Sequence, residues 1–296
     1  MSANRRTSIS EPLNQVLQSN SLHIKNREKV LEKINRILED GVQNVHVISD
    51  FDMTISKYWV NGERNVGSHR LLALSSRVTA EFREKTDAVY RHYYPIEISR
   101  TVSHEDKVQA MVEWWTKAHE SILELKLTKD DLERIAHEVQ IVLREGAVDF
   151  ADLCAKMDVP LLVFSAGLGD AIEAVLKNKG MLKPNVHIVS NMLRFDSKGV
   201  GVAFHEPLIH TFNKNEAAVG GPYIEAIIGR TNVILMGDSI GDLQMGEGLK
   251  HDVQLTIGFL NHDKDALIDE YASAFDIVVL DDGPMSIAIE ILSFMK

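Results

Sequence analysis

The sequence predicts an α/β protein built on a Rossmann-like parallel sheet, with a bundle of helices inserted after the first strand. Short apolar runs alternate with amphipathic helical segments through the second half of the chain. A charged stretch without a convincing strand interrupts this alternation between residues 60 and 144. Strands alternating with helices are typical of a parallel sheet covered on both faces. We therefore expect a core of residues 1–59 and 145–296 and an inserted helical domain of residues 60–144.

The bulk composition is that of a soluble globular protein. Of the 296 residues, 45% are apolar and 25% charged, and the net charge of −11 disfavours a nucleic-acid backbone or an anionic membrane as the main partner. No signal-peptide core and no run of about 20 apolar residues is present. The single cysteine, Cys154, excludes an intramolecular disulfide and suits a reducing compartment. We expect a cytoplasmic monomer with a loosely ordered segment over the first ~20 residues.

The first predicted elements are a helix and a buried strand. Residues 26–41 form a helix that Asn26 can cap and Gly41 can end, with apolar side chains on one face. The strand "VHVIS", residues 45–49, follows.

The insertion contains three segments with helical periodicity. They cover residues 70–95, 103–125 and 128–146. The core then resumes as helix 148–158, strand 159–167, helix 169–180, strand 185–193, strand 231–239, a helix near 241–248, strand 253–260 and strand 275–280.

Polar side chains gather where these strands end, which is where open parallel sheets bind ligands. The residues concerned are Asp50, Asp52 and Thr54 after the first strand, Ser165 and Ala166 after the second, Asp238 and Asp242 after "NVILMG", and Lys214 in a polar loop. Several carboxylates at one edge need a cation, and oxygen ligands without nitrogen or sulfur suit Mg²⁺. We assign Asp50, Asp52 and Asp238 to this metal.

The same residues can transfer a phosphoryl group. Ser165, the backbone N–H groups of the "SAG" turn and Lys214 can meet phosphate oxygens. An aspartate that attacks phosphorus forms an aspartyl-phosphate, and an acid two residues on can protonate the leaving oxygen and later activate water.

Four motifs in order resemble the haloacid dehalogenase superfamily of phosphatases: "DFDMT", "FSAG", Lys214 and "GDSIGD". The resemblance implies a Rossmann-like core with a helical cap that closes over the site. It also implies that Asp50 is the nucleophile, Asp52 the general acid/base and Asp238 a metal ligand. Asp242 would support the metal shell or orient Lys214.

The insertion supplies candidates for recognising a base. Glu97 follows "YYPI", and Trp115 and Ala118 share a helix face, where the small alanine leaves room for a flat ring. A guanine methylated at N7 is positively charged and stacks favourably on tryptophan. Its N1–H and exocyclic amine can both donate to one carboxylate, whereas cytosine offers one amino donor. The alternative is that Trp114 and Trp115 are both core residues of the helical domain.

Nearly the whole chain resembles the type III cytosolic 5′-nucleotidases, through "DFDMTIS", "KAHES", "FSAG", "LIHTFNKN" and "GDSIGDL". The family's pyrimidine-specific branch reads E-W-Y-T-K-S-H on the helix, and its 7-methylguanosine phosphate-specific branch reads E-W-W-T-K-A-H. The "EWWTKAH" found here resembles the second branch. This implies Mg²⁺-dependent hydrolysis of 7-methylguanosine 5′-monophosphate, and of CMP, to nucleoside and phosphate. The alternatives are a pyrimidine-specific 5′-nucleotidase, a phosphatase for sugar phosphates or phosphoproteins, and a protein that binds 7-methylguanine nucleotides without turnover.

Overall fold

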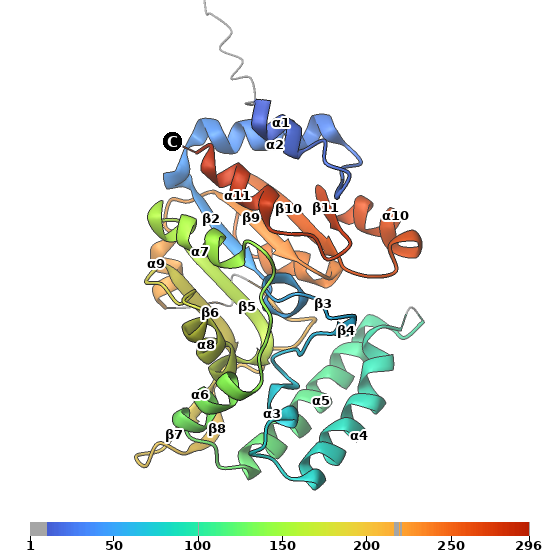
Figure 1. The fold of residues 1–296 in the computed structure, drawn as a ribbon, viewed down its shortest axis with the longest axis vertical. Helices are drawn as coiled ribbons and strands as arrows, with labels where there is room; N and C mark the ends of the chain where they lie inside the picture. Colours follow the sequence, from blue (N-terminus) through green and yellow to red (C-terminus); the bar gives the residue numbers. More distant parts are fainter. Residues whose placement is uncertain (1–10, 100, 216–218, 220, 296) are drawn as a thin grey trace, which may run out of the picture.

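The structure is a computed structural model that describes residues 11–99, 101–215, 219 and 221–295. Its centre is a seven-stranded sheet in the order β1-β11-β10-β9-β2-β5-β6, in which only the β1–β11 pair is antiparallel (Figure 1). The strands are β1 (Leu22–His23), β2 (Val45–Ser49), β5 (Leu161–Leu168), β6 (Val186–Asn191), β9 (Asn232–Gly237), β10 (Val253–Leu260) and β11 (Ile277–Leu280). The predicted α/β fold is confirmed. From the central β2 the chain adds β5 and β6 on one side and β9 to β11 on the other, so the strand order reverses at β2.

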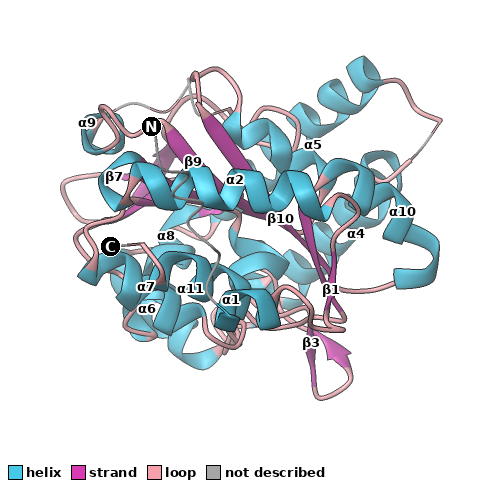
Figure 2. Cartoon of the chain, turned by 90° about the horizontal axis from the view of Figure 1, so that it is seen from above, coloured by secondary structure: helices cyan, strands magenta, loops and turns pink. Residues whose placement is uncertain are grey.

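Both faces of the sheet are covered, because alternate residues of each strand point to opposite sides. In β9, for example, Ile234 and Met236 join one apolar cluster and Val233 and Leu235 another. The first face is covered by α1 (Glu11–Val16), α2 (Arg27–Asp40), α7 (Ala147–Lys156), α8 (Gly169–Asn178) and α11 (Ser286–Ser293) (Figure 2). The other face is covered by α9 (Pro222–Ala226), the 3₁₀ helix η4 (Ile240–Gly246) and α10 (Lys264–Ala274).

The inserted segment stands beside the core in Figure 1. It runs through the small hairpin β3–β4 (Trp59–Val60 and Glu63–Arg64) to α3 (Leu71–Leu74), α4 (Ala80–Glu97) and α5 (His104–Glu124). The helices α4 and α5 pack against each other, and we call α3, α4 and α5 the cap. Helix α6 (Lys129–Glu138) packs against α8 of the core instead. The hairpin β7–β8 (Leu193–Phe195 and Gly201–Phe204) contacts α5.

Two predicted helices of the insertion are shorter than expected. The segment 70–95 breaks after α3, and Thr79 starts α4 anew because its hydroxyl accepts the N–H of Phe82 at 3.2 Å. The segment 128–146 is helical only to Glu138. The backbone N–H of Arg144 then donates to the carbonyl of Ile55 at 2.8 Å, which returns the chain to the core.

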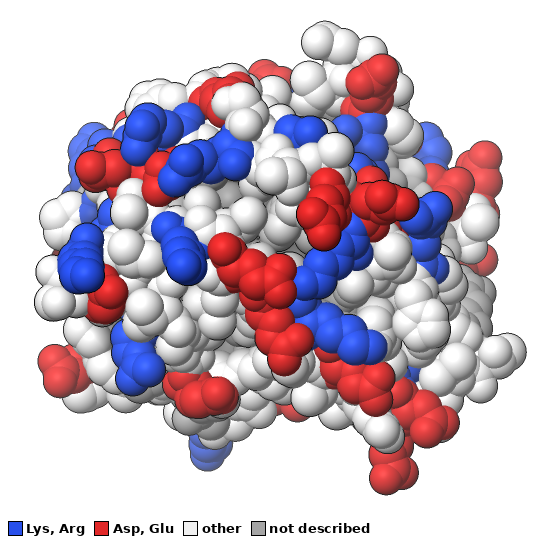
Figure 3. Space-filling view, turned by 90° about the horizontal axis from the view of Figure 1, so that it is seen from below, with Lys and Arg blue, Asp and Glu red and all other residues white. Residues whose placement is uncertain are grey.

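The expectation of a loose N-terminal segment is wrong from residue 11 onward. Helix α1 packs beside α11, and Leu13 and Leu17 are buried there (Figure 2). Residues 1–10 lie outside the described part of the chain. No helix in the described ranges is long and apolar enough to span a bilayer. On the face shown in Figure 3, Lys and Arg side chains are interspersed with Asp and Glu.

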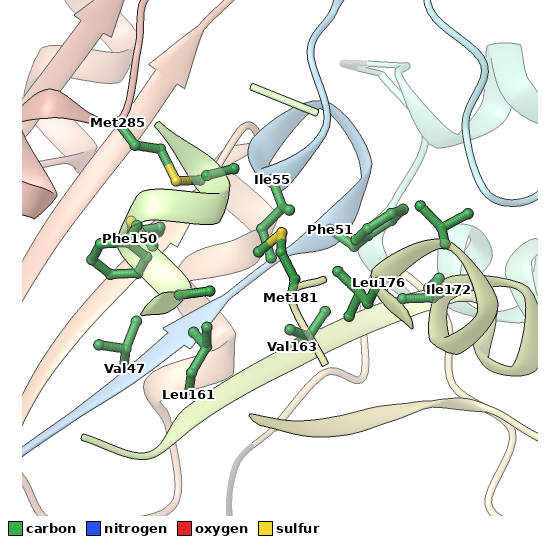
Figure 4. Close-up of a cluster of buried hydrophobic side chains, with 14 of the residues drawn as sticks. Val47, Phe51, Ile55, Phe150, Leu161, Val163, Ile172, Leu176, Met181 and Met285 are labelled. Carbon is green, nitrogen blue, oxygen red and sulfur yellow. The ribbon is translucent and has the colours of Figure 1, made fainter. Parts of the chain in front are cut away.

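The loop that follows β2 is anchored in the main apolar cluster. Phe51 and Ile55 are fully buried there, beside Val47, Val163 and Ile172 (Figure 4). Phe51 separates Asp50 from Asp52 in the sequence, so its burial holds the strand-end loop in place. This explains why a large apolar residue stands between two acids.

Candidate active site

Three neighbouring strands bring the predicted residues to one edge of the sheet. Strand β2 pairs with β9 on one side and with β5 on the other, all parallel. Asp50 follows β2 directly, Asp238 follows β9 directly, and Ser165 lies in the last half of β5. The carboxyl ends of these strands therefore define the candidate active site.

A group of three carboxylates occupies this edge. Ligand oxygens of Asp50, Asp238 and Asp242 all lie within 4.8 Å of one another. Burial raises the pKa of Asp50 to about 7, with Lys214 acting against the shift and Asp242 adding to it. Burial, together with Asp242 and Asp50, raises the pKa of Asp238 well above its ordinary value. Two buried carboxylates and one half-buried one, Asp238, supply a set of oxygen ligands that fits a hard divalent cation such as Mg²⁺.

Lys214 bridges two of these acids. Its Nζ lies 2.5 Å from Oδ1 of Asp50 and 3.1 Å from Oδ1 of Asp242, and all three side chains are buried. Burial lowers the pKa of Lys214, but Asp242 and Asp50 more than offset it and the net pKa is raised, so the ammonium stays charged. The other oxygen of Asp242 accepts the backbone N–H of Ser239 at 3.0 Å and caps η4. Asp242 therefore orients Lys214 and caps the helix at once.

The carboxylate of Asp52, the third residue assigned to the metal from the sequence, lies outside this group of three acids. Its two oxygens accept the backbone N–H and the hydroxyl of Ser68, at 2.6 and 2.5 Å. Burial raises the pKa of Asp52, and the Ser68 hydrogen bonds act in the opposite direction. Ser68 lies on the segment between β4 and α3, so a residue of the inserted segment holds this acid. Sequence reasoning missed Ser68.

The turn that follows Asp50 and leads into the inserted segment is held by a buried arginine, Arg144. Phe51–Ile55 forms a tight π-type turn in which Met53 has a φ of 62°, a strained value for a residue with a side chain. Arg144 donates to the carbonyls of Met53 and Thr54 at 2.5 and 2.6 Å, and Asn261 also donates to Met53 at 3.0 Å.

Further contacts of Arg144 join it to the ends of β10 and β11, including hydrogen bonds to the carbonyl of Gly283 at 2.7 Å and Oδ1 of Asn261 at 3.0 Å. It pairs with Asp282 at 3.1 Å, and its guanidinium lies over the ring of Phe259 at 4.2 Å. The hydroxyl of Thr54 is buried and has no hydrogen-bond partner within the described residues. No signal in the sequence pointed to Arg144, which fell inside a predicted helix.

Near the end of β5, the backbone at Gly167 approaches the inserted segment closely. The hydroxyl of Ser165 accepts the N–H of Gly167 at 3.0 Å, and the carbonyl of Ala166 accepts from the side chain of Asn191 at 2.7 Å. A Cβ at Gly167 would lie 2.0 Å from the hydroxyl oxygen of Ser68. A glycine is therefore required where β5 approaches the inserted segment.

Two of the predicted base-reading residues, Glu97 and Trp115, take part in contacts between cap and core, whereas Ala118 lines a small pocket among cap residues such as Leu72 and Phe82. Glu97 is the last residue of α4, and its Oε1 accepts the hydroxyl of Thr211 at 2.6 Å. Burial raises the pKa of Glu97, and the Thr211 hydrogen bond counters part of that rise. Trp115 and Ala118 are both buried on α5, and Trp115 shares an apolar cluster with Ala166 of the core.

The two tryptophans differ in their surroundings. Trp114 stacks on Tyr93 of α4, with ring centroids 6.0 Å apart and planes at 14°. Trp115 stands edge-on to His69, with centroids 4.9 Å apart and planes at 80°. Trp114 is thus a packing residue inside the cap. Trp115 also stacks on Trp114, with centroids 6.0 Å apart and planes at 14°, and it belongs to an apolar cluster that includes Ala166 of the core.

A Rossmann-like sheet with grouped carboxylates and a buried lysine at its carboxyl edge, beside a helical cap, has the fold of haloacid dehalogenase-type hydrolases. The fold matches that of a HAD-family hydrolase from Salmonella enterica at a TM-score of 0.50 and 12% identity, over 87% of this chain and 73% of that one.

The model of the family described as "Pyrimidine 5′-nucleotidase (UMPH-1)" matches residues 53–296, and the chain belongs to this family. It is 39% identical to a chicken protein named "7-methylguanosine phosphate-specific 5′-nucleotidase", over 94% of this chain and 97% of that protein. A crystal structure of cytosolic 5′-nucleotidase IIIB bound to cytidine matches at a TM-score of 0.87 and 34% identity, covering 95% of each chain. The predicted family is confirmed, and the chain is a 5′-nucleotidase.

Proposed function

We propose that this enzyme hydrolyses 7-methylguanosine 5′-monophosphate, and CMP as a second substrate, to the nucleoside and phosphate. Two contacts between cap and core carry the proposal. Glu97 accepts a hydrogen bond from Thr211, three residues before Lys214, and Trp115 shares an apolar cluster with Ala166, the neighbour of Ser165. The chain is also 39% identical to a relative named for this substrate. A methylated, cationic guanine would stack on Trp115 and donate two hydrogen bonds to Glu97.

The chain's own residues supply the chemistry. Asp50 would attack phosphorus and form an aspartyl-phosphate, as the 5′-oxygen leaves on the opposite side. Asp52, held by Ser68, would protonate that oxygen and later take a proton from the water that cleaves the intermediate. Lys214 would neutralise charge that builds up on the phosphoryl oxygens, while Ser165 and the adjacent backbone would hold them.

Mg²⁺ is the metal we propose for the acid group, with Asp50, Asp238 and Asp242 as the carboxylates nearest to it. When bound, it would offset the charge of these acids and of the phosphate. We also propose that the protein is cytoplasmic, in keeping with the cytosolic relative and the single cysteine, and that it is a monomer.

The pyrimidine-specific reading is the second candidate. The description of the family model and the cytidine in the related crystal structure favour it. Both candidates use the same chemistry and differ only in the base. A binding protein without turnover has no use for a buried aspartate paired with a lysine, and we set that reading aside.

The test is a panel of phosphomonoesters assayed with Mg²⁺ and with EDTA. It contains the 5′-monophosphates of 7-methylguanosine, cytidine, uridine and guanosine, together with ribose 5-phosphate. We expect the highest kcat/KM for 7-methylguanosine monophosphate, measurable turnover of CMP and loss of activity in EDTA. An Asp50→Asn protein should be folded and inactive. Faster turnover of UMP and CMP than of the methylated nucleotide would assign the enzyme to the pyrimidine branch.

A further inference from the structure

One hydrogen bond joins the cap to the core beside the proposed base site. The hydroxyl of Thr211 donates to Oε1 of Glu97 at 2.6 Å, across 114 positions of sequence. Glu97 ends a cap helix, and Thr211 lies in a core loop three residues before Lys214. Within the described ranges, no other side chain donates a hydrogen bond to Glu97.

The core loop that carries Thr211 is fixed on both sides. The side chain of Asn191 donates to the carbonyls of Ala166 and Ile209 and accepts the N–H of Ile209, at 2.7, 2.8 and 2.9 Å. The N–H of His210 donates to Oδ1 of Asn213 at 2.7 Å. Thr211 therefore follows two residues, Ile209 and His210, whose backbones are held by side-chain hydrogen bonds, and Asn191 joins this segment to the end of β5.

The cationic side chains near Glu97 do not replace this contact. Lys214, Lys107 and Arg64 lower the pKa of Glu97 through space. Lys214 is committed to Asp50 and Asp242 by direct contact. The orientation of the Glu97 carboxylate therefore depends on the Thr211 hydroxyl.

We propose that Thr211 is a positioning residue for base recognition. It fixes one oxygen of Glu97 and leaves the remaining acceptor sites of the carboxylate for the donors of the base. The same loop carries Lys214 at the phosphate site, so the spacing between base acceptor and phosphate is set by one segment. The inference rests on the proposed function, because it requires that Glu97 contacts the base.

The experiment compares Thr211→Val, which keeps the shape and removes the hydroxyl, with Thr211→Ser, which restores a hydroxyl. The readout is the ratio of kcat/KM for 7-methylguanosine monophosphate to that for ribose 5-phosphate, which has no base. Thr211→Val removes a hydrogen bond to a charged group, and this loss should lower the ratio about tenfold or more. Thr211→Ser should recover most of it.

The matched control is Thr116→Val on the exposed face of α5, where the hydroxyl bonds only to the carbonyl of Val112 at 2.7 Å. Its ratio should equal that of the wild type. If Thr211 acts through Glu97, Thr211→Val should cause no further fall in the ratio in a Glu97→Gln background.

The outcomes separate this inference from the proposed function. If Glu97→Gln lowers the ratio and Thr211→Val does not, the positioning role is wrong and the base site stands. If Glu97→Gln leaves the ratio unchanged, the proposed base site itself is wrong. An equal loss on both substrates in Thr211→Val would make the contact a general cap–core tie and would also overturn the inference.

Discussion

At the scale of single residues, the site contains buried charged side chains, each of which would be unfavourable without a partner of opposite charge. Asp50 and Asp242 are buried, and Lys214 contacts both of them. Truncating one partner of a buried ionic group leaves the others uncompensated. A residue that contacts the phosphate should affect all substrates equally, whereas a residue that contacts the base should affect only some of them.

Replacing Lys214 by alanine should reduce kcat/KM by at least a hundredfold for every substrate of the panel. The lysine neutralises charge on Asp50 and on the phosphate, which all substrates share, and an equivalent electrostatic donor is worth about 10²–10³ in rate. Steady-state kinetics on 7-methylguanosine monophosphate and ribose 5-phosphate measure the loss. A loss confined to one nucleotide would show that Lys214 reads the base.

Replacing Trp115 by alanine should lower the preference for the methylated base. Stacking of a base on an aromatic side chain contributes about 1–3 kcal/mol, so the ratio of kcat/KM for 7-methylguanosine to cytidine monophosphate should fall about tenfold. The ratio is the useful quantity, because Trp115 belongs to an apolar cluster that joins cap and core, and its loss will loosen cap closure for all substrates. Trp114→Ala is the matched control, and an unchanged ratio in Trp115→Ala would make Trp115 a packing residue only.

At the scale of elements, the turn after β2 is held from both sides. Arg144 and Asn261 hold the carbonyls of the strained turn from the core. Ser68 holds Asp52 from the inserted segment. Asp50 directly precedes this turn and Asp52 lies within it, but different parts of the chain contact their two side chains.

The close approach of β5 to this turn can be tested at Gly167. A methyl group there would collide with the hydroxyl of Ser68, at 2.0 Å, and would displace the partner of Asp52. We expect Gly167→Ala to lower kcat at least tenfold while the protein remains folded by circular dichroism. Gly180→Ala is a steric control with nothing within 4 Å of the new methyl, although its φ of +72° adds backbone strain of its own. Wild-type kcat in Gly167→Ala would mean that Ser68 is not needed to hold the acid.

At the scale of the whole molecule, the acid group couples stability to pH and to metal. Asp50 in the folded protein has a pKa of about 7, above its value in the unfolded chain. The folded state therefore binds more protons between the two pKa values, and unfolding free energy falls as pH rises through that window. A divalent cation that binds only the folded state should reverse this loss.

In EDTA, the deprotonation of Asp50 should lower the Tm as the pH rises from about 4 to 7. Adding Mg²⁺ at pH 7.5 should raise the Tm by several degrees. Asp238→Asn removes one acid of the group, so its Tm in EDTA should exceed that of the wild type, more at pH 7.5 than at pH 5. Its response to Mg²⁺ should be smaller. Equal Mg²⁺ responses in the two proteins would exclude Asp238 as a ligand.

The sequence by itself determined the fold class, the strands of the core sheet except β1, and most of the acid group. These features depend on local patterns. The spacing of apolar residues shows which side chains are buried in the core, and the ends of two parallel strands place Asp50 and Asp238 at one edge of the sheet. The motif "EWWTKAH" also placed Trp115 and Ala118 on one helix face. Where a pattern was locally ambiguous, as in the supposed helices 70–95 and 128–146, propensity alone predicted too much helix.

Only the tertiary structure decided which side chains complete the site. Arg144 meets Thr54 across 90 positions of sequence, and Thr211 meets Glu97 across 114. Ser68 reaches Asp52 only because Gly167 leaves space for it. Contacts of this kind depend on where separate segments come to rest in three dimensions, and no periodicity or spacing along the chain encodes them. The local pattern places each side chain on a face, and packing between segments selects its partner.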